Sequence, residues 1–423
     1  MYFKSNHMQK VGSSLFLILL VSSRLFAQDT LRLSLQKADS IFLAKNYYLL
    51  AASMNIEAER AQILQAKVYP NPIFTADINA YDPENKQAFH VGKSGQKVFQ
   101  LEQLIILGGK RRAEIEIAKT NTGIAELEFQ QLVRELKFRL HSDLYTIGQQ
   151  DFLLKKYTKQ LNLLDTLLKS YEVQANKGNI PLKEVVRLRG AYIQLNNDRA
   201  ELFKEYVLVQ TDLQILLQTS SFVLPDSPGE NLNHYLAPQS VGDLQNTAQE
   251  NLPELLVMKQ NKMLAEQYLS YQKRIAVPDI NVFASYDQRG GAFNNQVNAG
   301  VAIPLPLWNR NRGNIKTSQY RLQEAQYNLQ AKENEIMSRI NNSYAYYLQT
   351  VSEYKKSREL YNDDFEKTVD GMSMNFQKRN VSIIEFMDFF ESYNDVLAEL
   401  MRIKTQLVIS AEQINLLTGK DIY

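Results

Sequence analysis

The stretch at residues 296–315 changes pattern twice within twenty positions: QVNAGVAIPLPLWNRNRGNI. Apolar residues alternate with polar or small ones as far as Ile303, which is the period of a strand with one apolar face. Pro304, Pro306 and Trp308 follow, and the chain then reads as helix for about sixty residues. Proline donates no backbone hydrogen bond, so the two prolines should end the strand and fix the backbone at this strand-to-helix joint.

The same alternation predicts three further strands, over residues 73–81, 97–103 and 279–287. Two structures produce such a pattern: a half-buried antiparallel sheet, and the wall of a membrane barrel with its apolar face toward lipid. Four strands cannot close a barrel, because about eight are the fewest that do. A barrel would therefore need several copies of the chain, since two chains supply eight strands and three supply twelve.

A different period, 3.5 residues, marks the helical parts of the chain. Such a seam of apolar residues is typical of coiled-coil packing, and Arg199 and Lys404 interrupt it. A helix over residues 105–175 would be roughly 100 Å long, so it must project or span something. The seam positions are Leu154, Tyr157, Leu161, Leu164, Leu168 and Tyr171, then Val185, Leu188, Tyr192, Leu195, Leu202, Tyr206, Val209, Leu213 and Leu216, and then Phe386, Phe390, Tyr393, Leu397, Leu400, Leu407, Ala411 and Ile414.

The chain repeats itself at an offset of 200 or 201 residues, which predicts two copies of one plan. Gly108 and Gly109 occupy the first joint, where the second copy has its prolines. The expected domains are a first repeat, a segment that is either a flexible linker or an irregular packed layer, and a second repeat, over 28–220, 221–242 and 243–423. The aligned pairs are LGGKRRAEI (107–115) with LWNRNRGNI (307–315), NKGNIPLKEV (176–185) with QKRNVSIIEF (377–386), and LQILLQ (213–218) with QINLLT (413–418).

The N-terminal residues 1–27 read as an export signal, with basic residues before an apolar stretch and a cleavage site after Ala27. A membrane anchor is the alternative, but the apolar stretch is short for a span and Arg24 interrupts it. No later stretch is long and apolar enough for a transmembrane helix. We therefore expect an exported chain that is either soluble or embedded through β-strands.

Composition narrows the function further. Lys and Arg number 48 against 46 Asp and Glu, which gives no electrostatic case for nucleic acid. The chain has no cysteine, so it offers no disulfide, thiolate nucleophile or cysteine metal site. The four histidines are far apart, and no sequence motif places a serine nucleophile with them. We expect neither an enzyme nor a cofactor.

Two segments, LEQLIILGGKRRAEIEIA and VAIPLPLWNRNRGNI, resemble the strand-to-helix joints of the TolC-like outer membrane efflux proteins. They are most similar to the heavy-metal, CzcC-like branch, which typically shows LGGKR and PLPLFNRNQG. The resemblance covers essentially the whole mature chain and implies a mainly α fold with a small β part. Each chain of a trimer would give four transmembrane strands to one shared β-barrel and long helices to a coiled-coil α-helical barrel in the periplasm. The chain lacks the acylated cysteine of the branch's usual lipoprotein members.

The resemblance also implies a function: a passive outer-membrane exit duct for substrates that an inner-membrane pump of the RND type delivers through a periplasmic adaptor. Heavy-metal cations are the expected cargo. The alternatives are a drug-efflux or type I secretion channel of the same fold and, from another class, a soluble periplasmic coiled-coil scaffold. The expected partners are two further copies of the chain, the adaptor, the pump and outer-membrane lipid. Gating would occur by movement of the coiled coils at the periplasmic end.

The resemblance assigns sites residue by residue. Glu184 and Glu385 match positions of carboxylates that line the aperture and would favour cations, or they are two solvated glutamates on helix surfaces. The basic residues that follow the joints, among them Lys110 and Arg310, either begin solvated helices or contact phosphate headgroups. The positions expected at the periplasmic tip and adaptor contact are Gly178, Asn179, Ile180, Pro181, Arg379, Asn380, Val381 and Ser382.

Overall fold

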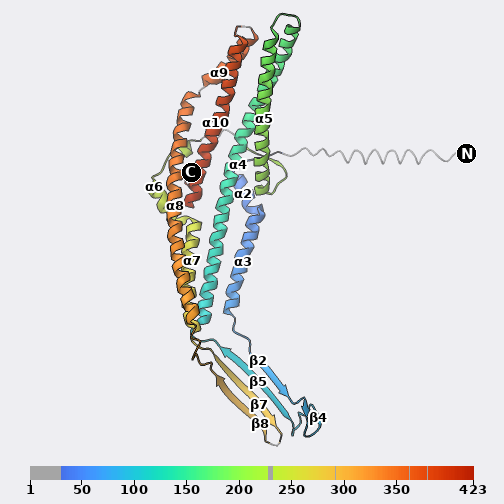
Figure 1. Cartoon of the computed structure of the whole chain (residues 1–423), viewed down its shortest axis with the longest axis vertical. Helices are drawn as coiled ribbons and strands as arrows, with labels where there is room; N and C mark the ends of the chain where they lie inside the picture. Colours follow the sequence, from blue (N-terminus) through green and yellow to red (C-terminus); the bar gives the residue numbers. More distant parts are fainter. Residues whose placement is uncertain (1–29, 227–231, 291, 362, 379) are drawn as a thin grey trace, which may run out of the picture. The chain divides into compact units, whose positions relative to one another are not determined.

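The computed structural model describes residues 30–226, 232–290, 292–361, 363–378 and 380–423 (Figure 1). The expected signal peptide and Arg379 lie outside these ranges. No helix in them combines the length and apolar character needed to cross a membrane. The chain divides into two compact units, one from the described parts of 1–46, 139–236 and 350–409, the other from 47–138, 237–349 and 410–423.

The described part of the chain contains long helices, short helices and short strands, in the order given by their numbering. The helices are α2 (Leu35–Lys45), α3 (Tyr47–Lys67), α4 (Lys110–Asn176), α5 (Leu182–Leu217), α6 (Val241–Asn251), α7 (Pro253–Ile275), α8 (Arg312–Leu360), α9 (Asp363–Gln377) and α10 (Ile383–Thr418), with a 3-10 turn η1 (Leu232–Leu236). The strands are β1 (Thr30–Leu33), β2 (Ile73–Ile78), β3 (Tyr81–Asp82), β4 (Gln87–Ala88), β5 (Gln96–Ile105), β6 (Phe222–Pro225), β7 (Ile280–Arg289) and β8 (Phe293–Ala302).

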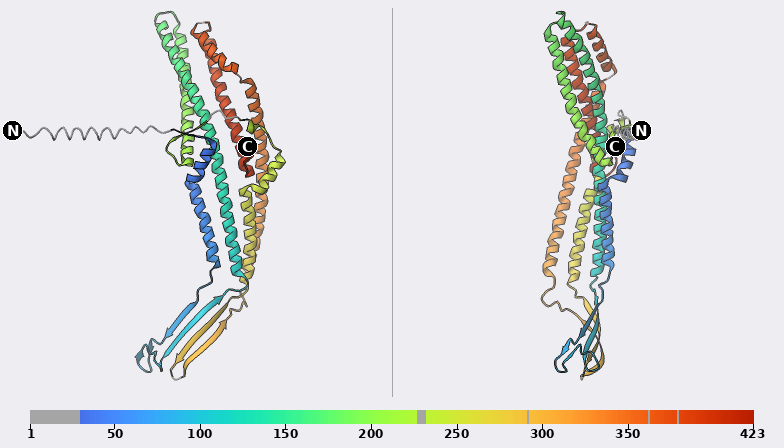
Figure 2. Two further views of the ribbon diagram at one scale, coloured as in Figure 1. Left: turned by 180° about the vertical axis from the view of Figure 1, so that it is seen from behind. Right: turned by 90° about the vertical axis from the view of Figure 1, so that its right-hand side faces the viewer.

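The four predicted strands form one antiparallel sheet in the order β2-β5-β7-β8 (Figure 2). The register places Ala76, Phe99, Tyr286 and Val297 in one cross-strand row, so the alternating apolar positions from which the strands were predicted share a face. That face is unusually open for apolar residues, since Val297 is 76% exposed in the single chain. In the described part of the chain, β2 and β8 each pair with one strand only, so the sheet has two open edges.

The second face of the sheet mixes polar residues such as Thr75 and Gln100 with apolar ones such as Ile73, and on this face an aromatic ring covers a glycine. Phe283 lies opposite Gly300 in the register. A β-carbon added to Gly300 would lie 2.4 Å from Cζ of Phe283, so the ring rests on the bare backbone. Glycine at this position therefore makes room for the ring, a device that stabilises glycine in strands.

The two strand-to-helix joints differ in their backbone as the residue types predicted. Gly108 and Gly109 both have φ of +68°, a left-handed conformation that strains other residues. Arg274 donates to the carbonyl of Gly108 over 3.2 Å, and Asp279 accepts both from the Leu107 N–H and from Lys110 Nζ at 2.8 Å. The first joint is thereby tied to the segment that links α7 to β7.

At the second joint, β8 ends at Ala302, two residues before Pro304. Asn311 then turns the chain with φ of +59°, and its side-chain amide donates to the carbonyl of Gln272 over 2.7 Å. Trp308, at this joint, is 92% exposed. Two prolines thus end the strand, and an asparagine fixes the start of α8.

The helical seams predicted by the 3.5-residue period are confirmed, because every seam position is buried or half-buried. In the first unit the apolar core includes Leu164, Leu188, Phe386 and Leu397 from α4, α5 and α10. The second long helix differs from expectation: α8 ends at Leu360 and α9 begins at Asp363, where one continuous helix was expected. The sequence at the break, YNDDF, is rich in residues that favour a helix start, which the apolar period alone does not register.

The segment between the repeats packs on the first unit instead of linking freely. β6 pairs in parallel with β1, and Val223 in it is fully buried. Gln210 of α5 exchanges two hydrogen bonds with the backbone of Val223, at 2.6 and 3.0 Å. Residues 227–231 of this segment lie outside the described residues.

Candidate functional site

The turn between α4 and α5 is shaped by one glycine. Gly178 has φ of +74°, and the N–H of Asn179 donates to the carbonyl of Gln174 over 2.9 Å. This is the usual way to satisfy the last carbonyls of a helix. Pro181 is the residue before α5, where its missing N–H costs nothing. The expected tip residues 178–181 therefore form a tight, ordered reversal between two long helices.

The turn between α9 and α10 is closed by a capping box. The N–H of Glu385 donates to Ser382 Oγ over 3.2 Å, and the N–H of Ser382 donates to a Glu385 carboxylate oxygen over 2.9 Å. The bond from the Ser382 backbone N–H, aided by the Ser382 side chain, lowers the pKa of Glu385. The Glu385 carboxylate thus caps the start of α10. The S-x-x-E spacing of Ser382 and Glu385 could have indicated this role.

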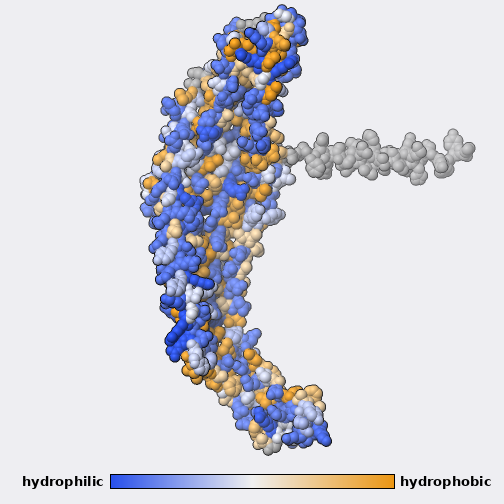
Figure 3. Space-filling model, viewed as in Figure 1, coloured by the Kyte–Doolittle hydropathy of each residue, from blue (hydrophilic) through white to orange (hydrophobic). Residues whose placement is uncertain are grey.

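The two turns lie side by side although about 200 residues separate them in the sequence. Together they line a groove of about 390 Å³, which we call the tip groove. Ile180 and Glu184 come from one turn, and Val381 and Ser382 from the other. The structure therefore brings members of both predicted tip sets to one place. Figure 3 shows hydrophobic residues at the surface at this end of the helices. Near the two turns, the apolar side chains of Leu182, Val186 and Ile384 are exposed.

A second groove, of about 600 Å³, continues from the tip groove between α5 and α10, since Arg187 and Ile384 line both. The charged residues of this groove, which we call the acidic groove, are acidic except for Arg187. Its carboxylates belong to Asp198, Asp388, Glu391 and Asp395. The sequence analysis missed this groove, although Asp388, Glu391 and Asp395 have helical spacing on one face of α10. The groove should attract basic side chains of a partner.

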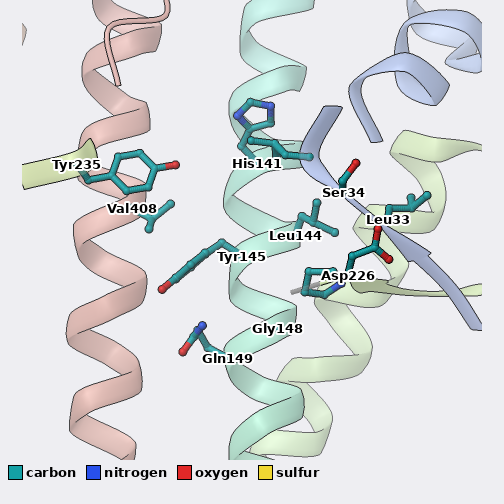
Figure 4. Close-up of a pocket in the computed structure, with 12 residues that line it drawn as sticks. Leu33, Ser34, His141, Leu144, Tyr145, Gly148, Gln149, Asp226, Tyr235 and Val408 are labelled. Atoms are coloured by element: carbon teal, nitrogen blue, oxygen red, sulfur yellow. The ribbon is translucent and has the colours of Figure 1, made fainter. Parts of the chain in front are cut away.

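A small cavity lies beside the middle of α4 in the same unit (Figure 4). Its volume is about 90 Å³, room for a few water molecules. His141, which lines it, lies with Nε2 2.9 Å from the carboxylate of Asp39. Tyr145 and Gln149 point from α4 toward Val408 of α10 in the close-up. The cavity is too small for an organic ligand, and its polar lining suits ordered water.

The hairpin loop after β2 holds a hydrogen-bonded chain of Asp82, His90 and Ser94. His90 Nδ1 lies 2.7 Å from an Asp82 oxygen, and its Nε2 lies 3.0 Å from Ser94 Oγ. The order is that of a hydrolytic triad. The N–H groups that follow Ser94, of Gly95 and Gln96, already donate to carbonyls within the loop over 3.0 Å, so they cannot bind an oxyanion. We therefore assign these three hydrogen-bonded side chains a structural role in the loop.

Among the described residues, no three His, Asp or Glu side chains converge so as to hold a metal ion. The acidic groove accordingly presents separated carboxylates. The tip groove contains Glu184 beside Lys183 and Arg187, so its charges are mixed. In the described part of the chain, the two grooves thus present separated charges and no metal-binding cluster.

Known proteins share both sequence and fold with this chain. Residues 244–420 match the family model described as outer membrane efflux protein. The cobalt-zinc-cadmium resistance protein CzcC of Cupriavidus metallidurans is 23% identical over 297 residues, 70% of this chain and 68% of CzcC. Crystal structures of CusC give a TM-score of 0.75 at 16% identity, covering 92% of both chains. The CmeC outer membrane channel of Campylobacter jejuni gives a TM-score of 0.75 at 12% identity, covering 92% of this chain and 86% of that one. The mainly helical fold with a small sheet is thus one that solved channel structures have.

Proposed function

Because residues 244–420 form an outer membrane efflux protein domain, we propose that this chain is the outer-membrane channel subunit of a tripartite efflux system. The family and the fold are those of outer-membrane channels, not of enzymes, and the expected family and location are confirmed. The observation that carries the proposal is the sheet: its four strands gather exposed apolar residues on one face and leave both edges open. A sheet of that kind is completed by neighbouring copies and by lipid.

Three copies would supply twelve strands for one shared barrel, with the apolar face toward lipid. In that assembly the exposed Trp308, Arg310 and Arg312 would lie near the membrane interface, where tryptophan and cationic side chains are favoured. Lys110 is instead buried against Asp279. The two repeats, 28–220 and 243–423, each supply one hairpin and one set of long helices. We also propose that residues 1–27 are a signal peptide that is removed on export.

The helical part would form the periplasmic duct, with the tip groove and the acidic groove as the contact for the adaptor. The residues proposed for that contact are Gly178, Asn179, Ile180, Pro181, Arg379, Asn380, Val381 and Ser382. Movement of the coiled coils would open the end of the duct. Arg199 and Lys404 stand in the seams as polar interruptions, and burial lowers the pKa of Lys404, so the packing there is weaker than in an apolar seam.

Heavy-metal cations are the proposed cargo. The names of the relatives support this, since CzcC is a cobalt-zinc-cadmium resistance protein. Energy would come from an inner-membrane pump. Drug efflux through a channel of the same fold is the second candidate.

Two experiments test the proposal in order. The first is the mass of the mature protein extracted from outer membranes, with detergent subtracted. A mass of three chains supports the shared barrel, and a monomer in the aqueous periplasmic fraction overturns it. The second compares a deletion strain with its parent on cobalt, zinc, cadmium and copper salts and on common antibiotics. Sensitivity to metals alone supports the cargo, whereas sensitivity to antibiotics alone overturns it in favour of drug efflux.

The capping box separates two roles of Glu385. Ser382→Ala removes the acceptor for the N–H of Glu385 and should lower stability by about 1 kcal/mol. Glu385→Gln keeps the box, because glutamine also reaches the Ser382 N–H, but it removes the charge. If Glu385 lines the aperture, only Glu385→Gln reduces the cation selectivity of single channels in a planar bilayer. If Glu385→Gln leaves the cation selectivity unchanged, Glu385 caps the helix and does not line the aperture.

A further inference from the structure

A pocket of about 600 Å³ opens between α3, α4 and α7, in the unit that also contains the sheet. Its apolar lining residues include Val68 and Ile117, of which Ile117 is buried on α4. Three tyrosines, Tyr69, Tyr268 and Tyr271, line it from the end of α3 and from α7. The pocket is large enough for a drug-sized molecule, since ligand pockets span roughly 300–1,000 Å³.

The charged residues of the pocket lining are both acidic. Glu59 of α3 and Glu114 of α4 are the two ionisable carboxyl groups, and the lining contains no lysine, arginine or histidine. Tyr271 donates its hydroxyl to a Glu114 oxygen over 2.5 Å, which leaves the other carboxylate oxygen for a ligand. Burial, together with Glu114, raises the pKa of Tyr271 to about 12, so the hydroxyl keeps its proton and holds Glu114 in place.

Aromatic faces beside carboxylates are the combination that recognises organic cations, because the ring faces and the carboxylates both attract positive charge while the rings accept apolar groups. Tyr69 already shows this attraction: the guanidinium of Arg111 lies 3.9 Å from its ring centroid. Tyr268 is 42% exposed in the chain, so its ring is accessible. We propose that this pocket binds lipophilic organic cations, with Glu114 and Glu59 supplying the charge and the three tyrosines supplying the walls.

Arg111 competes with such a ligand. It covers one face of Tyr69 and also donates to the carbonyl of Lys67, at 3.0 Å from Nε. The positive charge of Arg111 at the pocket rim would repel a ligand cation. Arg111→Gln should therefore strengthen cation binding, whereas the substitution of a pocket carboxylate should weaken it.

The test is isothermal titration of the purified mature protein in a neutral detergent with tetraphenylphosphonium. Triphenylphosphine oxide serves as an uncharged aromatic counterpart. We expect the cation to bind at least about tenfold more tightly than the oxide. Glu114→Gln, which still accepts from Tyr271, should weaken cation binding by about tenfold and leave the oxide unchanged. Tyr268→Ala should weaken both compounds, and Tyr268→Phe should restore them because the ring face remains.

A matched control lies two residues away on the same helix. Glu116 is an exposed carboxylate that pairs with Lys119 over 3.0 Å, and Glu116→Gln should not change binding. Equal binding of the cation and the oxide, wild-type affinity in Glu114→Gln, or no heat with tetraphenylphosphonium at millimolar concentration would each overturn the proposal. None of these readings depends on the trimer or on a pump, so they are distinct from a failure of the proposed function.

Discussion

Replacing Phe386 with alanine is expected to lower the free energy of unfolding by about 3–5 kcal/mol. The ring is 1% exposed, and its centroid lies 4.2 Å from that of Phe376 and 5.7 Å from that of Phe390. Alanine would leave a cavity where α9 and α10 meet behind the tip groove. The measurement is denaturant unfolding of the purified protein, followed by helical circular dichroism.

Two neighbouring substitutions serve as controls. Phe386→Leu keeps much of the side-chain volume, so it should lower the free energy of unfolding by less than about 1.5 kcal/mol. Ile384→Ala, two residues earlier on α10, removes a side chain that is 61% exposed and should change stability by about 0.5 kcal/mol at most. Equal losses in Phe386→Ala and Ile384→Ala would contradict the packing described here. Because Tyr171 of α4 stacks on Phe376 at 5.7 Å, Phe386→Ala should also loosen the contact between the two turns.

Asp143→Asn is expected to stabilise the protein above neutral pH, by up to about 4 kcal/mol. Burial within the first unit, reinforced by repulsion from Asp212 and opposed by Arg139, raises the pKa of Asp143 to about 7. One of its carboxylate oxygens, Oδ2, is buried without a hydrogen-bond partner. The ionised form is therefore the unfavourable one in the folded state.

The sign of the pH dependence follows from proton binding. An unfolded chain releases this proton near pH 4, whereas the folded chain keeps it until about pH 7. Stability from this group therefore falls as pH rises from 4 to 7, and the penalty stays constant above 7. Melting temperatures of the wild type and Asp143→Asn should coincide near pH 4 and diverge by pH 8, with the variant higher.

Asp165→Asn is the control on the same helix, since the Asp165 side chain is 44% exposed and paired with Lys169 over 2.6 Å. It should give no gain that grows with pH. A gain of equal size in both variants, or a gain for Asp143→Asn that is larger at pH 4 than at pH 8, would contradict the buried-carboxylate assignment. The outcome matters for function because Asp143 lies in a long helix of the proposed duct.

The parts of the fold that could be predicted are those in which one period persists. The strands of residues 73–78 and 280–289 alternate cleanly, and the register then places their apolar residues on one face. The seams of α4, α5 and α10 persist over several heptads, and all their positions are covered. The break before Asp363 was missed because local start signals interrupt a helix without disturbing the pattern on either side.

The candidate site was predictable only in part. Matching the repeats predicted that residues 178–181 and 380–382 are equivalent turns, but not that they line one groove. The resemblance leaves Glu385 either an aperture carboxylate or a solvated surface glutamate, and neither alternative uses its S-x-x-E spacing with Ser382. The tyrosine pocket could not be seen at all, because Tyr69 and Tyr271 are about 200 residues apart and carry no shared motif.

The exposed Trp308 gives the protein a built-in optical reporter. It is the single tryptophan among 423 residues, so its fluorescence comes from one place, the joint where β8 gives way to α8. In the free chain, at 92% exposure, it should emit at the long wavelength of a water-bathed indole. Transfer of the joint to a headgroup layer should shift that emission to the blue, because tryptophan partitions into the membrane interface. Assembly in lipid vesicles can thus be timed without any added label.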